Sequence, residues 1–135
     1  MTKKAWIYCR QKGPFQATGI EITRNYLQKR CAELGYEVVG SACAQTGGGE
    51  AKKAFMDMLE DISLTWKDVD IIIAKPSVIS HSTSDAVEIC DLADSLGIKI
   101  YAAIGAELID CSEQLSAAKI YDAMYTPVTD MTLQN

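Results

Sequence analysis

Short apolar runs alternate with helical periodicities along most of the chain, and this alternation constrains the fold more than any other feature. Apolar runs predict strands at residues 5–9, 36–44, 69–74 and 98–104. The third run, Val69 to Ala74, is apolar almost throughout, as expected of a strand that is buried on both faces. Strands that alternate with helices predict an α/β fold: an open, mostly parallel sheet of four to five strands, with helices on both faces in three layers.

Apolar side chains recur at helical spacing between these runs. The three predicted stripes are Ile20, Leu27, Cys31 and Leu34; Phe55, Met58, Leu59 and Ile62; and Ala86, Ile89, Ala93 and Leu96. Ser82, with Asp85 three residues later, forms a capping-box pattern at the start of the third helix. Gly35 and Gly97 are expected to end the first and third helices.

The 135 residues have the length of one domain, predicted over residues 1–110. A last helix over 111–126, capped by Ser112 and ended by Pro127, is expected to pack on this domain or extend from it, and residues 127–135 are expected to form a frayed tail. No apolar run approaches the roughly 18 residues needed to cross a bilayer. The N-terminal residues lack a signal-peptide pattern, so we expect a cytoplasmic protein without a membrane partner.

The chain has five cysteines and a single histidine. The cysteines are scattered without a Cys-x-x-Cys pair, and each follows or precedes apolar residues. This pattern favours reduced cysteines in the core over a metal site or a disulfide framework, and we expect no metal and no cofactor. The five are Cys9, Cys31, Cys43, Cys90 and Cys111.

The net charge of -5 conceals an asymmetry along the chain. Seven basic residues and one acidic residue up to position 31 give +6, which leaves -11 for the remainder. A protein that binds duplex DNA tightly normally presents a broad basic surface to the phosphates. We therefore expect DNA binding by this chain alone to be weak.

Ligands of open α/β sheets bind beyond the carboxyl ends of the strands, so the segments after the first three strands are the informative ones. The first strand ends in Tyr8-Cys9-Arg10-Gln11-Lys12, the second is followed by a segment from Gln45 to Lys53, and the third by a segment from Ala74 to His81. In order and spacing, these segments resemble the catalytic domain of serine recombinases (resolvases and invertases). The resemblance covers residues 4–108 and implies a resolvase-like, flavodoxin-like fold.

The resemblance places Lys12 where the family has its nucleophilic serine. Tyr8 and Arg10 match the family's Tyr-Ala-Arg-Val-Ser segment, but a protonated lysine cannot attack a phosphodiester to form the covalent link. In the second segment, Thr46 and Gly47 match the family's pattern and Lys52 stands at an arginine position.

The third segment departs further from the family's Lys-Leu-Asp-Arg-Leu-Ser-Arg signature. Lys75 and Ser80 are retained, whereas Ser77 stands at the aspartate, Val78 at the first arginine and His81 at the second. In the family these arginines stabilise charge on phosphoryl oxygens, and valine has no donor for this purpose. We therefore predict that the chain is not an active recombinase. The residues that remain as candidates for binding a phosphate or another anion are Arg10, Lys12, Lys52, Thr46 and Gly47.

The resemblance implies a binding, regulatory or oligomerisation module related to site-specific DNA recombination, with a second copy or a recombinase-like protein as partner. One alternative is an enzyme or binder that uses the same cleft for a phosphate-bearing small molecule or nucleotide. Another is an interaction module that uses the last helix through Tyr121, Met124 and Tyr125. An unrelated flavodoxin-like domain also stays open, because the fold hosts many functions.

Three further patterns favour structural or surface roles. The glycines at 47–49 lack the Lys-Ser/Thr ending of a P-loop, which favours a flexible loop over a phosphate cradle. His81 lies near two serines but has no nearby acidic residue to orient its ring, so a hydrolase triad is not predicted. The carboxylate pairs Asp57/Asp61 and Asp91/Asp94 lie opposite the apolar stripes and are expected to be solvated.

Overall fold

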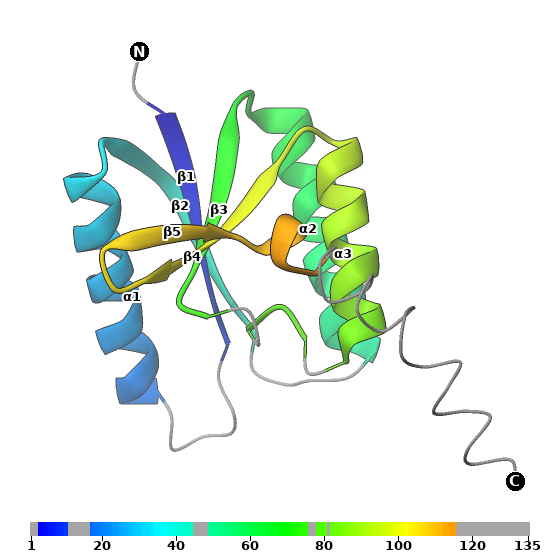
Figure 1. Ribbon diagram of the computed structural model, residues 1–135, viewed down its shortest axis with the longest axis horizontal. Helices are drawn as coiled ribbons and strands as arrows, with labels where there is room; N and C mark the ends of the chain where they lie inside the picture. Colours follow the sequence, from blue (N-terminus) through cyan, green and yellow to red (C-terminus); the bar gives the residue numbers. More distant parts are fainter. Residues whose placement is uncertain (1–2, 11–16, 45–48, 76–77, 81, 116–135) are drawn as a thin grey trace, which may run out of the picture.

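The computed structural model describes residues 3–10, 17–44, 49–75, 78–80 and 82–115 of the chain. Strands and helices alternate as expected, and the strands form one sheet (Figure 1). The elements are β1 (Lys3–Arg10), α1 (Ala17–Glu33), β2 (Tyr36–Ala44), α2 (Gly49–Thr65), β3 (Val69–Ile73), α3 (Thr83–Ser95), β4 (Lys99–Ile104) and β5 (Glu107–Asp110).

The strand order is β2-β1-β3-β4-β5. β1 pairs in parallel with β2 and β3, β3 pairs in parallel with β4, and β5 closes the order as an antiparallel partner of β4. This arrangement confirms the predicted fold class. The chain winds outward in both directions from β1 and β3, so the crevice where such sheets bind ligands lies beyond the carboxyl ends of these two strands.

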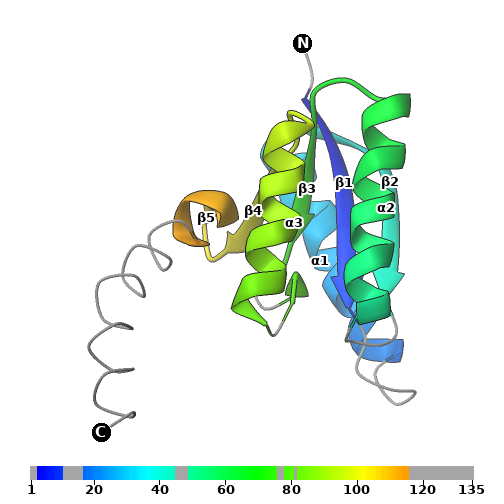
Figure 2. The ribbon, with the colours of Figure 1, turned by 90° about the vertical axis from the view of Figure 1, so that its right-hand side faces the viewer.

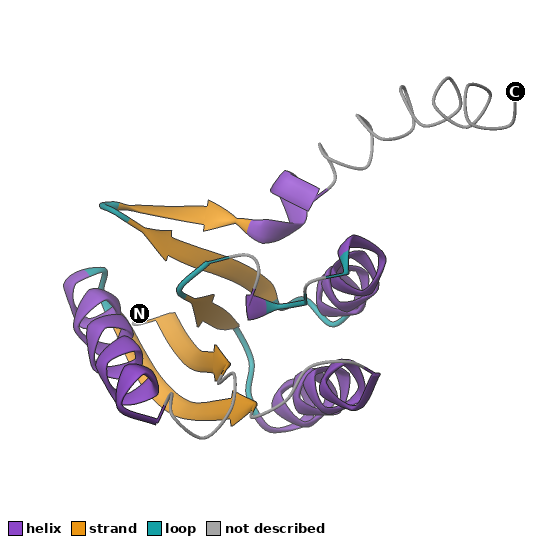
Figure 3. Cartoon of the chain, turned by 90° about the horizontal axis from the view of Figure 1, so that it is seen from below, coloured by secondary structure: helices purple, strands orange, loops and turns teal. Residues whose placement is uncertain are grey.

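The sheet lies between two helical layers, with α1 on one face and α2 and α3 on the other (Figure 3). α2 and α3 pack side by side (Figure 2). Leu27 and Cys31 of α1 are fully buried, as are Leu59 of α2 and Ile89 of α3, so the predicted stripes form the core. Residues 71–73 of β3 are also buried, which confirms that this strand is covered on both faces.

Two residues that were predicted to be in the core, Leu34 and Cys43, lie outside it. Leu34 is 41% exposed because α1 ends at Glu33, and Gly35 takes a left-handed backbone (φ 84°) immediately afterwards. Cys43 is exposed, unlike the other four cysteines, because β2 is an edge strand. The prediction that all five cysteines are core residues was therefore wrong for Cys43. All five are free thiols.

The predicted ends of α3 are confirmed. Ser82 Oγ accepts a hydrogen bond from the Asp85 amide at 3.4 Å, as an N-cap does. At the other end, Gly97 has a φ of 75°, its amide donates to the Asp94 carbonyl, and the Ile98 amide donates to the Ala93 carbonyl at 2.8 Å. This is the glycine-dependent Schellman ending of a helix.

Asp110, and not Ser112, caps the helical turn formed by residues 111–115. Its Oδ1 accepts hydrogen bonds from the amides of Ser112 at 2.9 Å and Glu113 at 3.2 Å, while Ser112 Oγ donates to Asp94 Oδ2 at 2.6 Å. The prediction of Ser112 as the cap was wrong because the chain enters the turn two residues earlier. The remainder of the predicted helix and the predicted tail lie outside the described residues.

In the part of the chain that the structure describes, no helix combines the length and the apolar character needed to span a bilayer. The same residues contain no cluster of His, Cys, Asp or Glu side chains that is arranged to hold a metal ion.

Candidate functional site

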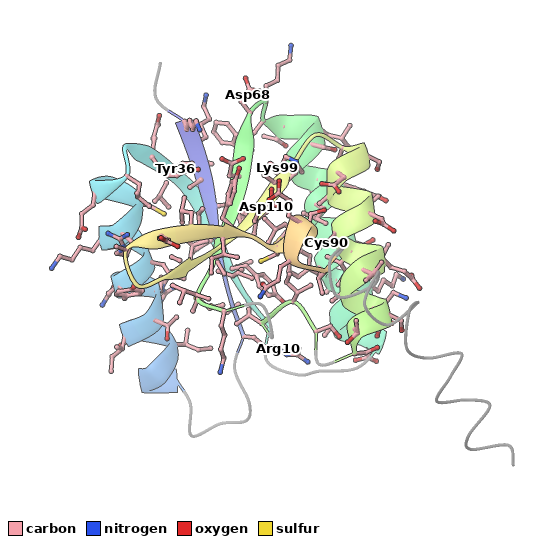
Figure 4. All side chains as sticks on the ribbon, viewed as in Figure 1. Arg10, Tyr36, Asp68, Cys90, Lys99 and Asp110 are labelled. Carbon is pink, nitrogen blue, oxygen red and sulfur yellow. The ribbon has the colours of Figure 1, made fainter. Side chains whose placement is uncertain are left out.

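Arg10 lies at the carboxyl edge of the sheet, where the fold predicts a binding crevice. It is the last residue of β1 and is paired in register with Ala44, the last residue of β2. Figure 4 shows Arg10 at the lower edge of the molecule, at the opposite end from Tyr36, Asp68 and Lys99. Among the described residues, no carboxylate lies within 4.0 Å of the Arg10 guanidinium, so its charge is not neutralised by them.

Tyr8 forms part of the core beneath this edge. Its side chain is 4% exposed, and its ring lies 4.4 Å from that of Phe55 at an interplanar angle of 57°. Burial raises the pKa of the Tyr8 hydroxyl, and the nearby positive charge of Arg10 partly offsets this rise. Tyr8 is therefore a core residue that packs on Phe55 of α2 near the end of β1.

Lys52, near the start of α2, is bound by two carboxylates of α3. Its Nζ lies 2.6 Å from Glu88 Oε2 and 3.5 Å from Asp85 Oδ1. The hydrogen bond to Glu88 raises the pKa of the Lys52 amine, and the charges of both carboxylates act in the same direction. An anion that approached Lys52 would have to compete with these two carboxylates for the ammonium group.

Val78, which the resemblance aligns with the family's first signature arginine, packs against the core. Its amide donates to the Lys75 carbonyl at 3.0 Å, and its side chain contacts the apolar cluster that includes the buried Ile79. Ser80 Oγ accepts a hydrogen bond from the Ser82 amide at 3.1 Å, so this serine takes part in the approach to α3. Residues 78–80, the described part of this loop, therefore pack on the core and lead into α3.

The described residues include Arg10, Lys52 and Val78 of the predicted site. Lys12, Thr46, Gly47, Ser77 and His81 lie outside them, so the anion-binding set remains a prediction. Asp85 and Glu88, the partners of Lys52, were not predicted. Their spacing of three places them on one face of α3, but the sequence gives no indication that α2 is the neighbour of that face.

No protein-family model matches the sequence, and no curated protein matches it either. Solved structures do match. A resolvase family site-specific recombinase from Streptococcus pneumoniae superposes with a TM-score of 0.70 at 20% identity, over 97% of this chain and 95% of the other. The N-terminal catalytic domain of TP901-1 integrase superposes with a TM-score of 0.70 at 22% identity, over 90% of this chain and 98% of the other.

A third match is the C-terminal catalytic domain of ISC1926 TnpA, an IS607-like serine recombinase. Its TM-score is 0.65 at 19% identity, over 95% of this chain and 85% of the other. These matches agree with the mostly parallel sheet and the two helical layers described above. The chain therefore has the fold of a serine recombinase catalytic domain.

Proposed function

We propose that this chain is a catalytically inactive serine-recombinase-like domain that acts by binding a protein partner in the cytoplasm. The partner is a second copy of the chain or a recombinase-like protein. The proposal rests on the side chains found at two positions where the resemblance expects arginine. Val78 packs its apolar side chain on the core, and Lys52 is bound by two carboxylates.

The sequence supports the same conclusion at the position of the attacking group. Formation of a covalent protein-DNA link requires an oxygen nucleophile there, and Lys12 carries an amine that is protonated at neutral pH. Stabilisation of the reacting phosphate requires several donors that converge on its oxygens. The resemblance expects serine, aspartate and arginine where this chain has Lys12, Ser77 and Val78. The chain therefore lacks both the nucleophile and part of the donor set.

A cleavage assay on supercoiled DNA tests the inactivity. We expect no relaxed or linear product and no covalent protein-DNA adduct from the natural chain. The single variant Lys12→Ser is expected to remain inactive, because a restored hydroxyl still lacks the donors that stabilise the phosphate. A variant that also carries Ser77→Asp and Val78→Arg is the informative comparison. Cleavage by the natural chain that is lost in Lys12→Ala would contradict the proposal.

The binding role requires a separate measurement. Sedimentation equilibrium of the full chain, alone and mixed with an active serine recombinase, should reveal a dimer or a mixed complex. A chain that stays monomeric in both experiments would rule out the proposed partners.

Arg10 supports a second candidate function, the binding of a phosphate-bearing small molecule or nucleotide in the same crevice. Arg10 is half-buried at the carboxyl edge, and its guanidinium has no carboxylate partner among the described residues. A ligand that binds the folded state alone raises the unfolding temperature by mass action. A rise in Tm with nucleotides that disappears in Arg10→Ala but persists in Arg24→Ala would favour this function.

A further inference from the structure

A groove lies along the C-terminal half of α2, away from the carboxyl edge of the sheet. It has a volume of about 530 Å³, which falls within the range of small-molecule sites. Its lining includes two tryptophans, two aspartates and two apolar residues of α2: Trp6, Trp66, Asp57, Asp61, Met58 and Ile62. The chain contains only two tryptophans, and both line this groove.

An irregularity in the sheet positions Trp6 in this groove. The register between β1 and β2 shifts after Ala5, so that Ala5 pairs with Val38 whereas Trp6 pairs with Gly40. The six-membered ring of Trp6 then lies across Gly40, and a methyl group at position 40 would overlap it. β-bulges commonly redirect a side chain in this way, and here the glycine leaves space for the indole.

Asp57 and Asp61 place negative charge at the rim of the groove. Both side chains are exposed, and their spacing of four residues brings the two like charges together on one face of α2. Among the described residues, neither carboxylate has a basic partner within 4.0 Å. A cation between them would relieve this repulsion.

The aromatic walls favour the same class of ligand. Indole faces attract ammonium and guanidinium groups, and the half-buried Met58 offers apolar surface for an aliphatic stem. The charge, the aromatic surface and the volume all suit a small organic cation.

We propose that this groove binds a small organic cation, a guanidinium or ammonium group on a short aliphatic stem. Asp57 and Asp61 neutralise the charge of the ligand, and Trp6 and Trp66 contact the charged group and its stem. This site is separate from the carboxyl edge, so it stands whether or not the proposed function holds.

Tryptophan fluorescence reports on the groove directly, because no tryptophan lies elsewhere in the chain. We expect a saturable change in emission when the protein is titrated with agmatine at constant ionic strength. N-butylurea has a similar length without a charge and should produce no saturable change. Equal responses to the two compounds, or no response to either, would overturn the proposal.

The carboxylates are tested by a double variant, Asp57→Asn with Asp61→Asn. Both side chains are exposed, so the fold should be retained, and the affinity for agmatine should fall about fivefold to twentyfold. The matched control is Asp91→Asn with Glu113→Gln, which changes the net charge equally at exposed positions outside the groove. If the control loses as much affinity as the groove variant, the effect is one of overall charge and the proposed site is wrong.

Discussion

Tyr36 and Asp70 form the one tyrosine-carboxylate hydrogen bond of the described residues, at the amino edge of the sheet. The Tyr36 hydroxyl donates to Asp70 Oδ2 at 2.8 Å. Burial raises the pKa of the Asp70 carboxyl, and the hydrogen bond from Tyr36 partly offsets this rise. A carboxyl whose pKa is raised on folding favours the folded state at pH values below its unfolded pKa. This contribution is lost as the pH rises through the folded value.

Tyr36→Phe should therefore destabilise the protein most at neutral pH. Without the hydroxyl, the charged form of Asp70 loses its donor, and we expect a loss of about 1 kcal/mol. The loss should shrink as the pH falls and Asp70 becomes protonated. Denaturant unfolding at several pH values measures this, with Tyr26→Phe at an exposed position as the control. An equal loss at all pH values would contradict the assigned role of the hydrogen bond.

Gly40 is predicted to be intolerant of even a small side chain. In Gly40→Ala, the added methyl group would meet the Trp6 ring, and overpacking of this kind costs about 1–3 kcal/mol. Ser41→Ala, at the next and exposed position, should change stability by no more than about 0.5 kcal/mol. Thermal unfolding compares the two variants. Equal stability of Gly40→Ala and the natural chain would show that Trp6 does not occupy the space above Gly40.

The site residues could be predicted from the sequence only in part. The sequence alone suggests, through the resemblance, that Lys12 aligns with the family's serine and Val78 with an arginine, and both alignments stay predictions. The carboxylate partners of Lys52 could not be predicted, because they lie on α3, more than 30 positions further along, and depend on how the two helices pack. The tryptophan groove was also missed, because it depends on a bulge between β1 and β2 that no local sequence pattern reveals.

At the scale of elements, the helix caps give the sharpest test. Ser82 Oγ accepts a hydrogen bond from the Asp85 amide at the start of α3. Replacement of such a cap by alanine lowers the free energy of unfolding by about 1 kcal/mol. Ser82→Ala should lose this amount, whereas Ser82→Asp should retain most of it because a carboxylate also caps a helix. Denaturant unfolding distinguishes them. If Ser82→Asp is as unstable as Ser82→Ala, the side chain does not act as a cap.

The strands and helices themselves were largely predictable. β2 has the predicted bounds, and β1, β3 and β4 differ from prediction by one or two residues. β5 was not predicted individually, because its four residues, Glu107–Asp110, are too few to establish an alternating pattern. The strand order was not readable either, since hydrophobic periodicity identifies a strand without identifying its neighbours.

At the scale of the whole molecule, charge limits what the chain can bind. The net charge of -5 opposes the approach of nucleic acid despite the basic first 31 residues. We predict a dissociation constant for duplex DNA weaker than about 10⁻⁴ M at physiological salt, the weak end of the range for non-specific binding. Fluorescence anisotropy with a labelled duplex measures this. Micromolar binding at that salt concentration would contradict the prediction.

The central claim is that a serine recombinase fold persists here without the chemistry that the resemblance implies. The most direct measurement is the intact mass of the protein after incubation with supercoiled DNA, denaturation and exhaustive nuclease digestion. We predict the unmodified mass of the chain alone. A population heavier by one nucleotide, with the added mass localised to a single side chain, would demonstrate a covalent intermediate and contradict the claim.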